Sequence, residues 1–127
     1  MSTSASDASK GALVVTAPAK VNLYLGVHTQ RDDRGYHRVD SVMAATSLAD
    51  VVTLAPAERL TVRTVPEADF PMGHNTAYRA ACALGEAFGR EPSFEIVIEK
   101  HIPLRAGLGG PSSDAAATLM GLCHAWG

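Results

Sequence analysis

Residues 93–120 read SFEIVIEKHIPLRAGLGGPSSDAAATLM and combine three different patterns in one stretch. In the first eight residues apolar and charged side chains alternate, which is typical of a half-buried strand. The inward side chains are Phe94, Ile96 and Ile98, and the outward ones are Glu95 and Glu99. After the glycines, apolar residues recur at helical spacing at Ala116, Leu119, Met120 and Cys123. The stretch therefore predicts a strand, a glycine-rich turn and a helix in direct succession.

The glycine-rich turn predicts a cradle for phosphate groups. Gly107, Gly109 and Gly110 remove side chains at a helix entry, where backbone N–H groups lack internal partners and the helix dipole is positive. Ser112 and Ser113 add hydroxyls that can donate to phosphate oxygens. The alternative is a plain glycine-rich turn followed by a serine N-cap, with the next aspartate balancing the dipole. The residues alone leave both interpretations open.

Two common phosphate-binding loops are excluded by the order of residues in this turn. A Walker A loop requires a lysine directly after its second glycine, and no lysine follows Lys100. A dinucleotide fingerprint requires a third glycine where, counted from Gly107, this chain has Ser112. A phosphate loop at this position is therefore of another kind.

The residues before this stretch predict further strands and another helix. Alternation over residues 13–28 favours a half-buried strand, and a polar hairpin loop follows at residues 29–37. Further strands are predicted at residues 38–48, 50–56 and 59–65. A helix is predicted over residues 74–89, with Asn75 as its N-cap and Gly89 at its end. The predicted buried side chains are Val21, Leu23, Leu25 and Val27 in the first strand, and Ala77, Ala81, Leu84 and Phe88 in the helix.

This order of elements predicts an α+β domain in which helices cover one face of a mainly antiparallel sheet. We expect the domain to span residues 12–127, after a small, polar and disordered tail at residues 1–11. The last helix presents apolar residues with no later segment to pack against. We therefore expect a C-terminal domain that is absent from this chain.

Composition restricts the classes of function. The chain has 127 residues, is 46% hydrophobic and has a formal net charge of −2, which is typical of one globular domain and does not favour nucleic acid as a partner. No apolar run is long enough to span a membrane, and the first residues lack the pattern of a signal or transit peptide. Cys82 and Cys123 are predicted to be reduced core residues of a cytoplasmic protein. The five histidines show no zinc-ligand spacing.

Three segments carry a resemblance to a known family. They are PAKVNLYLGV at residues 18–27, GYHRVDSV at residues 35–42 and IPLRAGLGGPSSDAA at residues 102–116. Together they resemble the galactokinase, homoserine kinase, mevalonate kinase and phosphomevalonate kinase superfamily of small-molecule kinases. The resemblance implies the N-terminal ATP-binding domain of that kinase fold, a ribosomal-protein-like two-layer domain. It also implies ATP and Mg²⁺ as cofactors, without assigning residues to the metal.

The first two segments resemble one branch of this superfamily. That branch phosphorylates the 2-hydroxyl of 4-diphosphocytidyl-2-C-methyl-D-erythritol, a cytidine diphosphate derivative, in non-mevalonate isoprenoid precursor synthesis. Two alternatives stay open. One is another small-molecule kinase of the superfamily, acting on a sugar or on a mevalonate-pathway acceptor. The other is a non-catalytic binding module with the same layout.

The resemblance implies roles for particular residues. Lys20 matches the active-site lysine, whereas without the resemblance it would be a strand-end lysine in solvent. Tyr36 and His37 match the pair that holds the cytosine, and Asn22 is implied as a further substrate contact. Asn75 and Lys100 lie where the family contacts the adenine. The ATP phosphate loop matches Pro103, Leu104, Arg105, Ala106, Gly107, Leu108, Gly109, Gly110, Pro111, Ser112 and Ser113.

Two departures from the family pattern stand out. Pro111 replaces a third consecutive glycine, which removes one N–H donor, although proline is well tolerated in the first turn of a helix. The family's catalytic aspartate belongs to a motif downstream of the glycine loop, and this chain has no such motif. The aspartates Asp32, Asp33, Asp40, Asp50, Asp69 and Asp114 all stand in other contexts. We therefore expect the chain to carry half of an active site and to show no turnover by itself.

Overall fold

The computed structural model describes residues 5–9 and 11–127. The strands are β1 (Ala5–Ser9), β2 (Ala12–Arg31), β3 (His37–Pro56), β4 (Thr61–Val65) and β5 (Phe94–Glu99). The helices are the short 3₁₀ helix η1 (Met72–His74), α1 (Thr76–Phe88) and α2 (Gly110–Trp126). The glycine-rich turn therefore lies between β5 and α2, as the sequence predicts.

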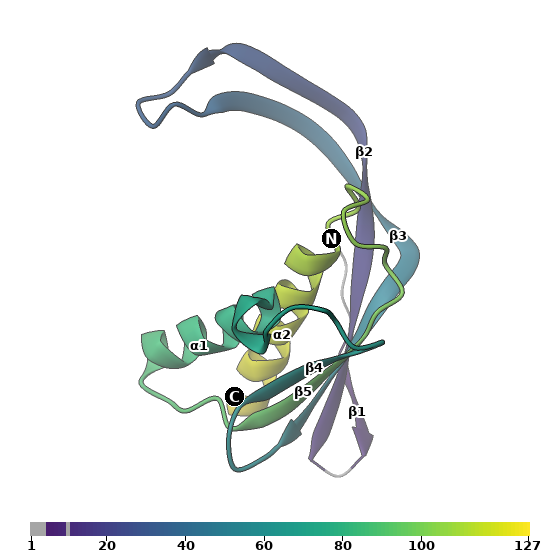
Figure 1. Ribbon diagram of the computed structural model, residues 1–127, viewed down its shortest axis with the longest axis vertical. Coiled ribbons are helices and arrows are strands. Elements are labelled where there is room, and N and C mark those ends of the chain that lie inside the picture. Colours follow the sequence, from purple (N-terminus) through teal and green to yellow (C-terminus); the bar gives the residue numbers. More distant parts are fainter. Residues whose placement is uncertain (1–4, 10) are drawn as a thin grey trace.

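The strands form one sheet in the order β1-β2-β3-β5-β4. All neighbouring strands run antiparallel except β4 and β5, which are parallel because α1 carries the chain back between them. Both helices pack on one face of this sheet (Figure 1). The predicted α+β domain with a mainly antiparallel sheet is confirmed, and the sheet is mixed because of its one parallel pair.

The core lies between the sheet and the two helices. The alternation in β5 buries Phe94, Ile96 and Ile98, as predicted. Helix α2 approaches the sheet closely, because a Cβ atom built at Gly121 would lie 2.6 Å from Cδ1 of Leu54 in β3. Only a residue without a side chain permits this spacing. The close packing holds α2, and with it the end of the glycine-rich turn, against the middle of the sheet.

Helix α1 has the predicted caps. The Asn75 side chain accepts a hydrogen bond from the N–H of Ala77 at 2.8 Å, and Gly89 ends the helix in the left-handed region. Of the predicted buried residues, Ala77 and Ala81 are fully buried and Leu84 is partly buried against the core. The prediction for Phe88 was wrong: it is the last helical residue, directly before the chain turns back, and it is exposed.

Strands β2 and β3 continue beyond the sheet as a curved two-stranded arm, residues 21–48 (Figure 1). The strands predicted separately at residues 38–48 and 50–56 are the single strand β3. Val21 is 37% exposed, and Leu23, Leu25 and Val27 are all more than half exposed, so the predicted burial of these four residues was wrong. Alternation leads to burial only where a second layer covers the strand. The helices cover β2 over residues 12–19 and leave its distal part uncovered.

Two more predictions concern the cysteines and the tail. Cys82 in α1 and Cys123 in α2 are free thiols and exposed, so their predicted place in the core was wrong. Within the predicted disordered tail, Ala5–Ser9 form β1 and pair with β2. Residues 1–4 and 10 lie outside the described residues.

Candidate functional site

Three residues of the glycine loop, residues 103–109, have a left-handed backbone conformation. Gly107 has a φ of 72°, Gly109 a φ of 71°, and Arg105 adopts a φ of 58° although it is not glycine. Gly109 is the N-cap residue of α2, and no side chain caps this helix. The serine N-cap interpretation is therefore wrong, since Ser112 and Ser113 lie inside the first turn of α2.

The first turn of α2 leaves hydrogen-bond donors without helical partners. The N–H of Ser113 donates to the carbonyl of Gly109 at 2.9 Å. The N–H groups of Gly110 and Ser112 precede that bond and have no acceptor within the helix, while Pro111 has no N–H. The Ser113 hydroxyl is fully buried and has no hydrogen-bond partner in the described part of the chain. Such a set of donors fits a phosphate group.

Lys20 of β2 lies directly against this loop. Its N–H donates to the carbonyl of Leu108 at 2.9 Å, which fastens the loop to the strand. Its side chain covers Gly109: a Cβ atom there would lie 3.0 Å from Cγ and 3.2 Å from Cε of Lys20. The Lys20 ammonium makes no ion pair with any residue that the structure describes. The structure thus brings together the lysine and the loop that the sequence placed far apart.

A buried ionic cluster lies behind the loop. Nζ of Lys100 donates to Oδ2 of Asp50 at 2.6 Å and to Oδ2 of Asp114 at 2.9 Å. Oδ1 of Asp50 accepts from the N–H groups of His101 and Ile102, at 2.7 and 2.9 Å. The cluster therefore ties β3, the start of the loop and the first turn of α2 together.

Sequence reasoning missed this cluster, because its members stand in unrelated parts of the chain with no local pattern. Its only sequence signal is that charged residues occur inside otherwise apolar segments, at Asp50 before VVTLAP and at Asp114 before AAATLM. Lys100, which the resemblance placed near the adenine, makes its contacts with the two carboxylates. Asn75, the other residue placed there, caps α1.

The two carboxyl groups of the cluster differ in protonation. Burial alone would raise the pKa of Asp50, but the neighbouring Asp114, Lys100 and the two backbone donors hold it below its ordinary value. Burial, together with the neighbouring Asp50, raises the pKa of Asp114 to about 7 despite its contact with Lys100. The pKa of Lys100 is raised by the two carboxylates, although burial opposes the shift. One lysine thus contacts two carboxyl groups, of which Asp114 loses its proton less readily than Asp50.

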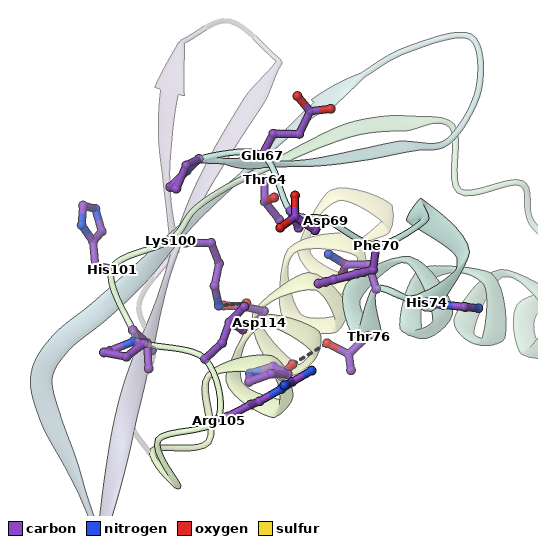
Figure 2. Close-up of a pocket in the computed structure, with 17 residues that line it drawn as sticks. Thr64, Glu67, Asp69, Phe70, His74, Thr76, Lys100, His101, Arg105 and Asp114 are labelled. Atoms are coloured by element: carbon purple, nitrogen blue, oxygen red, sulfur yellow. Dashed lines mark hydrogen bonds and ion pairs between the residues drawn. The ribbon is translucent and has the colours of Figure 1, made fainter.

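A cleft of about 800 Å³ adjoins the first turn of α2. It lies between the segment after β4, the start of α1 and the beginning of the glycine loop. Figure 2 shows Lys100 and Asp114 meeting at its wall, and Thr76 of α1 bonded across it to the carbonyl of Pro111 at 2.6 Å. Arg105 and Phe70 also line it. The cleft is large enough for a nucleoside next to the helix entry.

The tip of the arm carries Tyr36 and His37. Asp32 shapes the turn, because its carboxylate accepts from the N–H groups of Arg34 and Tyr36 at 2.9 and 3.0 Å. The Arg34 side chain, which also pairs with Asp32, lowers the pKa of this carboxyl group. The Tyr36 ring is exposed, with the Arg34 guanidinium 5.3 Å from its centroid. His37 donates from Nδ1 to the carbonyl of His28 at 2.8 Å and accepts at Nε2 from Arg31.

Asn22 faces differently from what the alternation predicts. The register pairs Asn22 with Met43 but Tyr24 with Val42, so Leu23 is an extra residue in β2. Met43 and Ser41 lie two residues apart on β3, so Asn22 shares a face with Ser41 and not with Tyr24. Accordingly, the Ser41 hydroxyl donates to Oδ1 of Asn22 at 3.0 Å.

The predicted site residues therefore form two groups. Lys20 and the loop from Pro103 to Ser113 lie together at the entry of α2. Tyr36 and His37 lie at the far end of the arm, away from that loop (Figure 1). Asn22 lies at the base of the arm, two residues along β2 from Lys20. The site is thus divided between the entry of α2 and the projecting arm.

Comparison with known proteins shows what this chain is similar to. Residues 75–127, which include the glycine loop, match the family model described as GHMP kinases N terminal domain. The chain is 46% identical over 121 residues to the 4-diphosphocytidyl-2-C-methyl-D-erythritol kinase of Rhodococcus jostii (strain RHA1). It is 47% identical over 116 residues to the kinase of the same name from Geobacillus sp. (strain WCH70). The chain is thus similar to GHMP kinases over the residues that match.

Solved structures agree with this relationship. A crystal structure of 4-(cytidine 5'-diphospho)-2C-methyl-D-erythritol kinase superimposes with a TM-score of 0.73 and 40% identity over 87% of this chain and 40% of that chain. A homoserine kinase from Cytophaga hutchinsonii superimposes with a TM-score of 0.68 at 22% identity, over 95% of this chain and 37% of its own, and shares the fold.

The alignments with these kinases cover most of this chain but less than half of each relative. The two named relatives align with 90% of this chain, which necessarily includes Lys20 and the arm. This chain in turn spans only 37% and 40% of their lengths. Within the described residues, neither helix is long and apolar enough to cross a membrane.

Proposed function

We propose that the full-length protein transfers the γ-phosphoryl group of ATP to the 2-hydroxyl of 4-diphosphocytidyl-2-C-methyl-D-erythritol. The observation that carries this proposal is the contact between Lys20 and Gly109, in a chain 46% identical to a kinase of that name. The contact supports a site in which a fixed cation lies beside a phosphate cradle. Phosphoryl transfer is catalysed mainly by such positioning and by charge stabilisation.

The donor is proposed to bind at the entry of α2. The free N–H groups of Gly110 and Ser112 would hold its phosphates, with the rest of the loop from Pro103 to Ser113 around them. The adjoining cleft would hold the nucleoside. Mg²⁺ is proposed to accompany ATP and to neutralise charge on its phosphates when bound. No residue of the chain is assigned to it.

The acceptor is proposed to lie between the loop and the arm. Tyr36 presents an exposed ring on which a cytosine can stack, and His37 has its ring fixed by two hydrogen bonds. Asn22, near Lys20, would contact the part of the acceptor close to the reacting hydroxyl. The general base and the remaining wall of the site are proposed to come from the length of the relatives that this chain does not span. A cytoplasmic location stays a prediction.

A coupled ADP-release assay tests this proposal. The full-length protein is incubated with ATP and Mg²⁺ and with 4-diphosphocytidyl-2-C-methyl-D-erythritol, homoserine, mevalonate or a sugar as acceptor. We expect turnover with the cytidine-bearing acceptor only. Turnover with another acceptor favours another kinase of the superfamily, and ATP-independent binding of the cytidine compound without turnover favours a binding module. Residues 1–127 alone serve as the comparison and are expected to show no turnover.

A further inference from the structure

Asp114 occupies an unusual position at the boundary between the glycine loop and the cleft. It belongs to the first turn of α2, directly after Ser113, and it lines the cleft. It is only 4% exposed. Its carboxyl group shares the single ammonium of Lys100 with the carboxylate of Asp50, which is fully buried. When both aspartates are ionised, the cluster holds one negative charge in excess.

The two oxygens of Asp114 are not equivalent. Oδ2 accepts a hydrogen bond from Lys100 at 2.9 Å. Oδ1 is buried and has no hydrogen-bond partner among the residues that the structure describes. Asp50, in contrast, uses both of its oxygens, with three donors around them. The carboxyl groups of Asp50 and Asp114 also lie within hydrogen-bond reach of each other, so a proton that enters this cluster is expected to reside on Asp114 and to be donated toward the Asp50 carboxylate.

A nucleotide changes the electrostatics of this position. Its phosphates are several negative charges, and the proposed function places them at the N–H groups that begin the same helical turn. A like charge nearby disfavours an ionised carboxylate and raises its pKa. The effect is strong here because the buried carboxyl group is little screened by solvent. The pKa of Asp114 is already about 7 before any phosphate is bound, so a further rise crosses neutral pH.

We propose that binding of nucleotide phosphates at the entry of α2 is coupled to the uptake of one proton by Asp114. The proton comes from the buffer and binds to the carboxyl group of Asp114, which turns an anion beside the phosphates into a neutral group. Lys100 then balances the charge of Asp50 alone. This inference rests on the proposed nucleotide site and adds to it that Asp114 is a positioning residue whose protonation adapts the helix entry to an anion.

Other charged groups lie around the loop and the cleft. Lys20 lies against Gly109, and no described contact links it to Asp114. The remaining charged or titratable residues that line the cleft are Glu67, Asp69, His74, His101 and Arg105, all of them exposed. Helix α1 contributes only the neutral Asn75 and Thr76 to this lining. Asp114 is thus the buried group of this wall that can gain a proton near neutral pH.

Isothermal titration calorimetry tests the proposal directly. The full-length protein is titrated with ATP, in excess Mg²⁺ and without acceptor, in PIPES, HEPES and Tris buffers that differ in ionisation enthalpy. A rise of the Asp114 pKa from about 7 by about one unit gives uptake of about half a proton at about pH 7.5. The measured heat should therefore vary linearly with the ionisation enthalpy of the buffer. The uptake should fade toward about pH 9.5, where both states are ionised.

Two variants complete the experiment. Asp114→Asn keeps the shape and the contact with Lys100 but cannot titrate, so its binding heat should be the same in all buffers. Glu95→Gln removes an exposed carboxylate from β5, outside the loop and cleft, and should keep the wild-type buffer dependence. Circular dichroism establishes that both variants are folded. If Asp114→Asn does not fold, the pH dependence of proton uptake by the wild-type protein is the test. Uptake that does not fade toward about pH 9.5 would then overturn the proposal.

The outcomes separate this inference from the proposed function. Clear ATP binding with the same heat in all buffers would overturn the proton coupling and leave the nucleotide site intact. Buffer dependence that persists in Asp114→Asn would assign the proton to another group and would also overturn it. Absence of ATP binding by the wild-type protein would overturn the proposed function itself, and the coupling with it.

Discussion

Gly109→Ala is the substitution for which the structure supports the most specific expectation. Two effects are combined in it. The residue has a φ of 71°, and placing a side chain in this left-handed region costs about 1–2 kcal/mol. In addition, the new Cβ would lie 3.0 Å from Cγ and 3.2 Å from Cε of Lys20. Since these contacts are tighter than van der Waals distance, the Lys20 side chain must move by some tenths of an ångström.

We expect the two effects to appear in different measurements. The free energy of unfolding should fall by about 1–2 kcal/mol, as determined by urea denaturation. In the ADP-release assay, kcat should fall about tenfold to a hundredfold, because a misplaced catalytic group loses much of its effect within an ångström. The KM for ATP should rise less than kcat falls, since the backbone donors of α2 stay in place. These expectations apply to the full-length protein with the cytidine-bearing acceptor.

Gly89→Ala is the matched control for backbone strain. Gly89 ends α1 with a φ of 63°, and a Cβ atom there meets nothing within 4 Å. It should lose a similar free energy of unfolding and keep its kcat. Gly107→Ala provides a second comparison within the loop, with a φ of 72° and again open space around the Cβ atom. If kcat of Gly109→Ala falls no further than that of Gly89→Ala, Lys20 is not the group that this glycine positions, and the argument fails.

Three further substitutions test other parts of the structure. His37→Ala should raise the KM for the cytidine-bearing substrate about tenfold to a hundredfold, which corresponds to the loss of about 1–3 kcal/mol of polar contact. The KM for ATP should change little, and an equal rise of both KM values would contradict a role in base binding. Asp114→Asn should alter the pH dependence of the free energy of unfolding. In the wild-type protein the carboxyl pKa is raised from 3.8 to about 7, so the native state holds the proton more tightly than the unfolded state. The wild-type stability therefore falls as the pH rises between these two values. Urea titrations should show this decline in the wild-type protein and a weaker one in the variant, and parallel curves would speak against it. Gly121→Ala places a Cβ atom 2.6 Å from Cδ1 of the fully buried Leu54 and should lower the free energy of unfolding by about 1–3 kcal/mol by overpacking; an unchanged urea midpoint would mean that α2 shifts freely on the sheet.

The parts of the fold that the sequence predicted are those determined by neighbouring residues. The alternation of β5 and the caps of α1 at Asn75 and Gly89 depend on a few adjacent side chains, and the structure has them where they were expected. The glycine loop is equally local, because left-handed backbone at Gly107 and Gly109 favours glycine whatever surrounds it. These features need no knowledge of the tertiary structure.

The features that the sequence did not reveal depend on distant partners. Asp50, Lys100 and Asp114 belong to three separate elements, and their residue types gave no sign that they share one hydrogen-bond network. The exposure of Leu23, Leu25 and Val27 follows from the absence of a covering layer on the described arm, which alternation cannot indicate. The burial of a side chain is decided by what packs against it, whereas a periodic pattern reports only which side chains share a face.

The extra residue at Leu23 is a local feature of β2 whose effect depends on pairing with the distant strand β3. Alternation assumes a regular strand, and one inserted residue reverses every assignment after it. Before the bulge, Asn22 shares its face with Met43; after it, Leu25 and Val27 occupy the face of Ser41 and Val39. Asn22 is therefore the only polar residue that β2 contributes to that face between Lys20 and Val27, and it bonds to Ser41 there. Asn22 precedes the bulge and stays on the face of Lys20, whereas the bulge places Tyr24 on the opposite face, so an acceptor that contacts both Lys20 and Asn22 must approach from the face that these two residues share.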